Sequence, residues 1–301
     1  MEALILTPDS APLSREIADY PEGIIIPIDK PYRWTSADVI RKVKFAAIRH
    51  FGKKTLKVGH AGTLDPLATG VLLVCIGKAT KLAEELQKHD KEYVAGVTFG
   101  ATTPSYDLEK EIDRFFPHEH ITASSVKAAL PAFLGEQDQV APLFSAKSVD
   151  GVRAYELARK LHKEGKTLDE AAQELIRTAR INISGLELLT FEGGSGCGLQ
   201  DRATPLAAGG GAHEVGGVVL QAAATSASSR INVTDNSALG LPRAVVRMAC
   251  SKGTYVRAFA RDLGEALGSG AHLDSLQRSR SGIFRVENAL TVNQAIRMLA
   301  L

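Results

Sequence analysis

The stretch that decides the fold is GHAGTLDPLATG at residues 59–70, which runs directly into VLLVCI at residues 71–76. Three glycines, one proline and two threonines surround a single acid, Asp65, and a single histidine, His60. Glycine and proline interrupt regular structure, so we predict a loop over residues 57–69 followed by a buried β-strand. A constrained loop that presents one carboxylate suits a catalytic site. Composition alone favours a simpler interpretation, in which Asp65 caps a turn and His60 is a surface histidine.

The patterning on either side of this stretch predicts the other elements. Further strands are expected at residues 23–28, 91–99, 180–191 and 244–250. One helix is expected to begin at Ser36 as its N-cap, and others at residues 80–86, 121–134, 154–164, 169–178 and 254–267. Strands and helices interleave without a strict βαβ rhythm, which predicts an α+β fold with a mixed sheet.

The composition also predicts how the chain is divided. Residues 1–22 are expected to form a loose N-terminal extension, and residues 23–301 a single domain. Within that domain the 48 residues from 193 to 240 include 10 Gly, 9 Ala and 5 Ser. Such a segment buries too little apolar surface to offset chain entropy. We therefore predict a flexible insertion with one weak strand at residues 215–220, and a functional lid is the alternative.

The charges are segregated, although the net charge is only +2. Nine Lys and Arg residues and two acids lie between Asp29 and His60, and five basic residues and no acid lie between Arg243 and Arg261. Two basic segments that meet on one face would form a nucleic-acid footprint. Solvated helix faces are the alternative interpretation.

Several protein classes are excluded by composition. Hydrophobic residues make up 45% and charged residues 23% of the 301 residues, which excludes wholesale disorder. No apolar run approaches the roughly 18 residues needed to span a bilayer. The N-terminus lacks the basic start of an export signal, and the three cysteines lack the spacing of a zinc site or a disulfide framework. We therefore expect a cytoplasmic protein without a metal.

Other segments carry residues suited to binding RNA or a flat substrate. Tyr93 lies in a predicted strand, where it would stack on a flat substrate or fill the core. Lys147 lies in a Pro-stiffened stretch that suits phosphate contact, or is a surface turn. Lys252 precedes a predicted helix whose free N–H groups would meet an anion. Arg257 would pair with a carboxylate from elsewhere in the fold, and Leu276 is expected in the core.

Four segments in order resemble the TruB family of tRNA pseudouridine synthases. They are GHAGTLDPLATG at residues 59–70, KEYVAGVTFG at 91–100, SAKSVDGVRAY at 145–155, and CSKGTYVRAFARDLG at 250–264 with GAHL at 270–273. The opening Asp29-Lys30-Pro31 is similar to the family's first motif, although Trp34 stands where the family usually has Gly. The resemblance covers about residues 23–192 and 243–290.

The resemblance implies roles for three catalytic residues. Asp65 matches the aspartate that starts to break the uridine N-glycosidic bond. Tyr93 matches the tyrosine that stacks on the flipped base and is a candidate for proton transfer. Arg257 matches the arginine that pairs with the catalytic carboxylate. The implied fold is the α+β pseudouridine synthase fold, a largely antiparallel mixed sheet flanked by helices around an active-site cleft.

The resemblance also implies substrate-binding roles. Tyr255 and Leu276 match residues that line the pocket, and His60 matches a histidine that fills the gap left by the flipped base. Lys30 and Pro31 match residues that support the pocket. The expected substrate is the T-arm of tRNA, and the expected reaction is isomerisation of uridine 55 to pseudouridine without a cofactor or a metal. The protein is expected to be a monomer.

Two departures from the family pattern are noted. Few residues follow Leu290, so the C-terminal RNA-binding PUA domain of many members is expected to be absent, and the residue 193–240 insertion has no family role. Two alternative functions stay open, a tRNA-folding chaperone in which catalysis is secondary and a related synthase acting on another RNA.

Overall fold

The computed structural model describes most of the chain. The described residues are 2–142, 144, 148–149, 152–153, 178–194, 213–215, 218–220 and 231–300. The predicted helix at residues 154–164 and nearly all of that at 169–178 lie outside these residues, as does Lys147. None of the helices that are described is both long and apolar enough to cross a bilayer.

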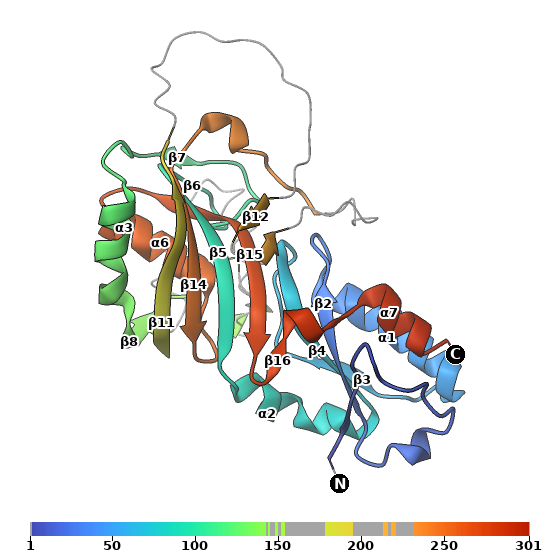
Figure 1. Cartoon of the computed structure of the whole chain (residues 1–301). Coiled ribbons are helices and arrows are strands. Elements are labelled where there is room, and N and C mark those ends of the chain that lie inside the picture. The colour runs from blue at the N-terminus through green and yellow to red at the C-terminus, as the bar shows by residue number, and fades with distance from the viewer. Residues whose placement is uncertain are drawn as a thin grey trace. The chain divides into compact units, whose positions relative to one another are not determined.

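The chain divides into two compact units, which are described separately. The first unit comprises Met1–Tyr93, Ala223–Ile231 and Gln277–Leu301, and the second comprises Val94–Ala222 and Asn232–Leu276. Two strands that Figure 1 labels, β5 (Lys91–Phe99) and β15 (Ala271–Ser281), each contribute residues to both units.

The first unit contains mixed β-sheet. Its strands, besides parts of β5 and β15, are β1 (Leu4–Ile5), β2 (Ile24–Lys30), β3 (Val58–Ala61), β4 (Ala68–Ile76), β16 (Phe284–Arg285) and β17 (Leu290–Thr291). Strand β4 runs antiparallel to β2 and β3, and β1 and β17 each lie parallel to β2. The predicted strands at residues 23–28 and 71–76 are confirmed.

Two predictions about this unit are wrong. The N-terminal segment contains β1 and the 3-10 helix η1 (Ile17–Asp19), and Leu6 is fully buried. The predicted loop at residues 57–69 contains β3 and the start of β4. Both errors concern short strands of two to four residues or the end of a longer strand. Such segments form because they pair with residues distant in the sequence, so no local pattern predicts them.

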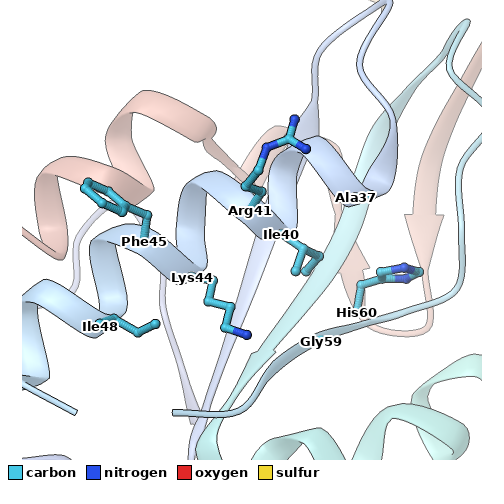
Figure 2. Close-up of a pocket in the computed structure, with 8 residues that line it drawn as sticks. All are labelled: Ala37, Ile40, Arg41, Lys44, Phe45, Ile48, Gly59 and His60. Atoms are coloured by element: carbon cyan, nitrogen blue, oxygen red, sulfur yellow. The ribbon is translucent and has the colours of Figure 1, made fainter. Parts of the chain in front are cut away.

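Helix α1 (Ser36–Phe51) shows why its sequence is helical. Thr35, not the predicted Ser36, is the N-cap, and its side chain and that of Asp38 form a capping box. Gly52 ends the helix in the left-handed conformation, and Val39 and Val43 lie on the buried face. The opposite face borders an open groove beside β3 (Figure 2).

The remaining helices of the first unit are short. They are η2 (Gly77–Leu82), α2 (Ala83–Lys88), η5 (Val286–Asn288) and α7 (Val292–Met298), and α7 packs against α1. The helix predicted at residues 80–86 is confirmed in the form of η2 and α2.

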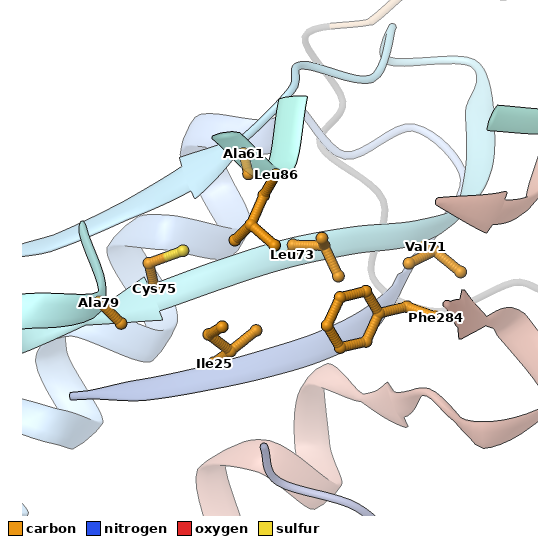
Figure 3. Close-up of a cluster of buried hydrophobic side chains, with 8 residues drawn as sticks. All are labelled: Ile25, Ala61, Val71, Leu73, Cys75, Ala79, Leu86 and Phe284. Carbon is orange, nitrogen blue, oxygen red and sulfur yellow. The ribbon is translucent and has the colours of Figure 1, made fainter. Parts of the chain in front are cut away.

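An apolar cluster forms part of the first unit's core (Figure 3). Its members come from β2, β3, β4, η2, α2 and β16: Ile25, Ala61, Val71, Leu73, Cys75, Ala79, Leu86 and Phe284. Burial of each large aliphatic or aromatic side chain contributes about 1.5–3 kcal/mol. The run VLLVCI therefore anchors the strand that follows the Asp65 loop.

The second unit is mainly antiparallel sheet. Its longer strands are β8 (Gly135–Gln139), β11 (Ala179–Glu192) and β14 (Arg243–Cys250), and β11 pairs antiparallel with both others. Its helices are α3 (Ala123–Ala129), η3 (Leu130–Phe133), η4 (Ser237–Leu239) and α6 (Val256–Ala266). The strands predicted at 91–99, 180–191 and 244–250 and the helices at 121–134 and 254–267 are confirmed.

Short strands complete the second unit. They are β6 (Ala101–Thr102), β7 (Arg114–Phe115), β9 (Ser148–Val149), β10 (Val152–Arg153), β12 (His213–Val215) and β13 (Val218–Leu220). Strands β12 and β13 pair antiparallel, so the single weak strand predicted at residues 215–220 is a pair of strands instead. Strand β15 was not predicted, because polar residues alternate irregularly along it. The α+β class and the mixed, largely antiparallel sheet are confirmed.

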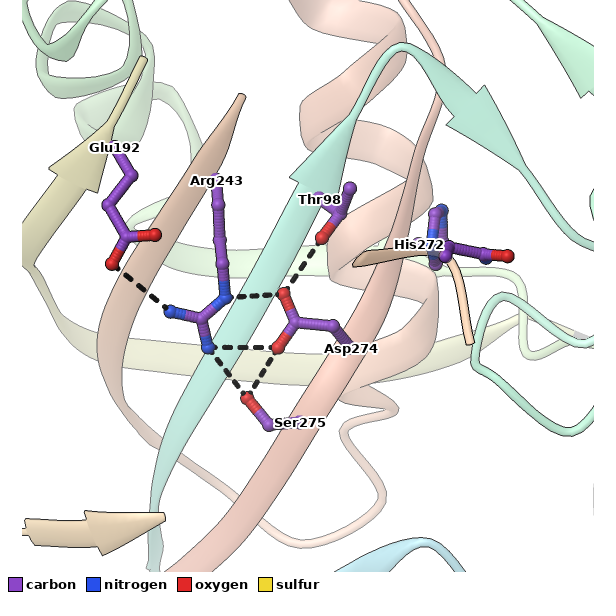
Figure 4. A network of polar contacts seen from close by, with 7 residues as sticks. Thr98, Glu192, Arg243, His272, Asp274 and Ser275 are labelled. Atoms are coloured by element: carbon purple, nitrogen blue, oxygen red, sulfur yellow. Dashed lines mark hydrogen bonds and ion pairs between the residues drawn. The ribbon is translucent and has the colours of Figure 1, made fainter. Parts of the chain in front are cut away.

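A polar network joins four strands of the second unit (Figure 4). Arg243 on β14 donates from Nε to Asp274 Oδ2 at 2.7 Å and from Nη2 to Asp274 Oδ1 at 2.9 Å. Thr98 on β5 donates to the same carboxylate at 2.8 Å, and Glu192 on β11 lies 4.0 Å from the guanidinium. Burial opposes ionisation of Asp274, but the bonds from Arg243 outweigh it and hold the pKa of Asp274 below its ordinary value.

Candidate active site

The Asp65 loop lies in the first unit between β3 and β4. Glycine is favoured at Gly62, where the loop begins, and at Gly70 near the start of β4, since their φ values are +90° and +95°. At Gly70 a Cβ atom would lie 2.3 Å from the backbone oxygen of Arg278, so no larger residue fits there. The backbone N–H of Gly70 also donates to Asp29 Oδ1 at 3.0 Å.

Both neighbours of Asp65 are fixed by hydrogen bonds. The Ser36 hydroxyl accepts from the Leu64 N–H at 3.0 Å and donates to the Leu64 carbonyl, 3.2 Å away. The Pro66 carbonyl accepts from the Arg33 N–H at 3.0 Å and from Lys30 Nζ at 3.2 Å. The residues before and after the carboxylate are therefore tied to α1 and to the end of β2.

Lys30 is fully buried at the end of β2. Its ammonium donates to the carbonyls of Pro31 at 2.9 Å, Trp34 at 2.6 Å and Pro66 at 3.2 Å. Burial lowers the pKa of Lys30 to about 7, although the charges of Asp65 and Asp29 act in the opposite direction. Lys30 thus holds the loop and attracts the carboxylate of Asp65.

Arg278 on β15 also holds this loop, and sequence reasoning missed it. It is 2% exposed, and it donates from Nε to the Val71 carbonyl at 2.7 Å and from Nη2 to the Gly62 carbonyl at 3.2 Å. One guanidinium therefore joins the start of the loop to the strand that follows it. Arg278 lies two residues after the predicted pocket residue Leu276, so it would share a strand face with Leu276. That segment was not predicted as a strand, and the signal was therefore missed.

Two other predicted site residues lie in the first unit. Tyr93 is on β5 and is 9% exposed. His60 is half-buried on β3, and burial and the nearby charge of Arg278 both lower its pKa. A neutral imidazole is therefore favoured at pH 7, which suits stacking on a base more than pairing with a phosphate.

In the second unit, Arg257 on α6 is held by a loop that also went unrecognised in the sequence. Its Nη1 donates to the Ser105 carbonyl at 3.0 Å, and its Nε lies 3.7 Å from Asp107 Oδ2. Asp107 in turn accepts from the Ser105 hydroxyl at 2.6 Å and from the Glu109 N–H at 3.0 Å. Acids gather in the sequence at residues 107–113, which include this partner, but no local pattern indicated that one of them pairs with Arg257.

The other predicted residues of the second unit are placed by α6 and β15. Tyr255 is the N-cap of α6, and its N–H donates to Gln139 Oε1 at 2.8 Å. Lys252 is exposed in the turn before that helix, next to Gly253 with φ +82°. Leu276 is half-buried on β15.

The structure changes the interpretation of the basic segment at residues 243–261. Four of its five cations pair with acids of the same unit: Arg243 with Asp274, Arg247 with Glu187, Arg257 with Asp107 and Arg261 with Asp262. Lys252 remains exposed. Most of this charge is therefore used within the fold: three of these guanidinium groups meet carboxylates that are distant in the sequence, and Arg261 meets that of the next residue.

The predicted site residues are thus grouped by unit. Lys30, His60, Asp65 and Tyr93 belong to the first unit, and their arrangement brings Lys30 and Asp65 together electrostatically. Tyr255, Arg257, Lys252 and Leu276 belong to the second. The expected pairing of Asp65 with Arg257 therefore stays a prediction. Across the described residues, no group of three or more His, Cys, Asp or Glu side chains is arranged to hold a metal ion.

Comparisons with known proteins give consistent results. The profile of the TruB family pseudouridylate synthase (N terminal domain) matches residues 49–193. The tRNA pseudouridine synthase B of Phocaeicola vulgatus is 43% identical over 274 residues, which cover 91% of this chain and 92% of the relative. That of Thermus thermophilus is 39% identical over 273 residues, which cover 88% of this chain and 75% of the relative.

The fold is also similar to that of solved structures. In the crystal structure of a Cbf5-Nop10-Gar1 complex, one chain aligns with a TM-score of 0.56 and 22% identity, over 97% of this chain and 58% of that chain. This likeness concerns the fold alone. On the strength of the identity and coverage of its relatives, the chain belongs to the TruB family of pseudouridylate synthases.

Proposed function

We propose that this protein is a tRNA pseudouridine synthase that isomerises uridine 55 in the T-loop of tRNA. The observation that carries the proposal is the Asp65 loop, which presents one carboxylate between residues fixed by Ser36 and Lys30. The named activity of its relatives, tRNA pseudouridine synthase B, supports the same reaction. We place the protein in the cytoplasm as a monomer.

The reaction needs the target base outside its stack. Extrusion of a base costs a few kcal/mol, and stacking on aromatic side chains returns roughly 1–3 kcal/mol per base. Tyr93 is assigned to stack on the flipped uracil. His60 is assigned to fill the vacated space, and Tyr255 and Leu276 are assigned to line the pocket.

In the chemical step, Asp65 starts the break of the bond between N1 of uracil and C1′ of ribose. The detached uracil turns, and C5 forms a new bond to C1′. C5 then loses its proton, for which Tyr93 is the candidate acceptor, and N1 gains one. Atoms and electrons balance without a redox cofactor or a metal.

Cations are positioned around Asp65. A carboxylate that acts as a nucleophile must be held in the right orientation. Lys30, when protonated, attracts the Asp65 carboxylate and binds the Pro66 carbonyl of the same loop. Arg257, which is held by Asp107 and the Ser105 carbonyl, is assigned to orient the carboxylate.

Phosphate contacts position the RNA. Seven exposed cations of the first unit are available for this: Arg41, Lys42, Lys44, Arg49, Lys53, Lys54 and Lys57. Lys252 is the exposed cation before α6, and Lys147 is assigned to the same role from the sequence. Because such contacts release counterions, binding of the T-arm should weaken as salt concentration rises.

The experiment is a pseudouridine assay on an unmodified tRNA transcript. Wild type and Asp65→Asn are compared at RNA concentrations that saturate each, since the isosteric amide keeps the size of the side chain. We expect conversion at uridine 55 by wild type and none by the variant. Tight binding without conversion by wild type would indicate a tRNA chaperone or another RNA target instead.

A further inference from the structure

We propose that the groove between α1 and β3 is a second RNA-binding site, which takes an unpaired base of the substrate and its phosphate outside the uridine pocket. The groove has a volume of about 530 Å³ and lies within the first unit (Figure 2). This inference rests on the proposed function in one respect: the proposed function identifies the RNA as tRNA.

The apolar side of the groove fits a base. Ile40, Lys44 and Ile48 recur every four residues along α1, so a single stripe of the helix faces Gly59 and His60 of β3. Next to this stripe Phe45 is 65% exposed, although the following residue, Ala46, is buried. An exposed phenyl ring is a ready surface for base stacking.

The cations of the groove fit a phosphate. Lys44 makes no ion pair with any described residue, and no acid lines the groove. Arg41 is paired with Asp38, so Lys44 is the lining cation without an acidic partner in this part of the fold. Arg49 adds a guanidinium 5.7 Å from the centre of the Phe45 ring. This charge complements an anion and would repel a second copy of the same face.

His60 forms the opposite wall and joins the groove to the Asp65 loop, which begins two residues later. Its imidazole is favoured in the neutral form, so it presents an aromatic face and not a second positive charge. A groove with a cation on one side and aromatic rings at its edges is suited to single-stranded nucleic acid.

Fluorescence anisotropy of a labelled tRNA transcript tests the inference with Lys44→Gln and Phe45→Ala. We expect each variant to raise the Kd about fivefold or more. For Lys44→Gln the slope of log K against log salt should also become shallower by about 0.9, the value for one lost phosphate contact. The matched controls are Lys127→Gln on the exposed face of α3 and Phe115→Ala, whose ring is 68% exposed on β7. Both should bind as wild type does.

Three outcomes overturn the inference. Both groove variants could bind tRNA with the Kd and salt slope of wild type, or the control variants could lose as much affinity as the groove variants. The groove variants could also change the sedimentation of the protein, and so its oligomeric state, without changing its affinity for RNA. Pseudouridine formation by wild type separates this inference from the proposed function. If wild type converts the transcript and the groove variants bind normally, the groove assignment alone fails. If wild type binds through the groove but converts nothing, the proposed function alone fails.

Discussion

The buried and half-buried cations of the two units have different kinds of partner. In the first unit, Lys30 and Arg278 donate their hydrogen bonds to backbone carbonyls around the Asp65 loop. In the second, Arg243 and Arg257 pair with the carboxylates of Asp274 and Asp107.

The difference has a physical consequence. A carbonyl fixes the path of the backbone but leaves the cation's charge uncompensated, whereas a carboxylate neutralises that charge and fixes a side chain. The first arrangement shapes a loop and leaves positive charge beside a functional acid. The second joins strands of a sheet, as Arg243 and Asp274 do. We therefore expect changes in the first unit to affect the reaction and changes at Arg243 to affect mainly stability.

The largest effect is expected where the loop meets Arg278. Gly70→Ala places a Cβ atom against the Arg278 backbone in a strained conformation, so it should lower the free energy of unfolding by more than about 3 kcal/mol. Gly62→Ala has a similar φ but no close contact, and it should cost only about 1–2 kcal/mol. Urea unfolding measures both. Equal losses would mean that the close approach to Arg278 is unimportant.

The second prediction concerns the charge pair of the other unit. Arg243→Met leaves the half-buried Asp274 carboxylate without its cation, next to the hydroxyl donors Thr98 and Ser275. It should lower the free energy of unfolding by about 3 kcal/mol. The double variant Arg243→Met with Asp274→Leu should recover most of this loss, because it removes both charges. A double variant as unstable as the single one would show that the pair's charge is not what holds these strands.

The third prediction concerns the free energy needed to bury a cation, Lys30, whose hydrogen-bond partners are carbonyl groups, and it uses pH as the variable. The pKa of Lys30 falls from its ordinary 10.5 to about 7 on folding, so the unfolded chain binds more protons between these values and stability rises with pH. The difference in unfolding free energy between wild type and Lys30→Met should therefore grow by about 2 kcal/mol from pH 7 to pH 9. A difference that stays constant with pH would mean that Lys30 titrates normally.

The smallest effect is expected at the hydroxyl that holds Leu64. Ser36→Ala removes two hydrogen bonds to the backbone but leaves the N-cap Thr35 intact, and should cost about 1–2 kcal/mol. Thr35→Ala is the matched change, since it removes the capping box and not the loop contact. Both should unfold more easily in urea, but only Ser36→Ala should slow pseudouridine formation. If both variants slow pseudouridine formation equally, the contact of Ser36 with Leu64 has no specific role in the reaction.

Local patterns predicted the longer elements of this fold well. The ends of β5 match the prediction, and β14 begins one residue earlier, because alternating or continuous apolar residues are a local signal. The N-cap of α1 was misplaced by one residue because Thr35 and Ser36 are both good caps, and the contact of Ser36 with Leu64 decides between them.

The candidate site was predictable only in part. Asp65 and Lys30 were identified from motifs that are continuous in the sequence. Arg278 and Asp107 were missed because their roles depend on distant partners: Arg278 binds the carbonyl of a residue 207 positions away. No local pattern reports such a contact.

The central claim is that Arg278 positions the Asp65 loop for reaction, whereas Arg243 holds the sheet. Single-turnover pseudouridine formation at saturating tRNA, together with urea unfolding, compares Arg278→Lys with Arg243→Lys. A lysine reaches only one of the two carbonyls, so we predict that Arg278→Lys reacts about 100-fold more slowly while it remains folded and binds tRNA. Arg243→Lys should react at the wild-type rate but unfold at lower urea. A wild-type rate for Arg278→Lys, or a comparable loss of rate in both variants, would contradict the account.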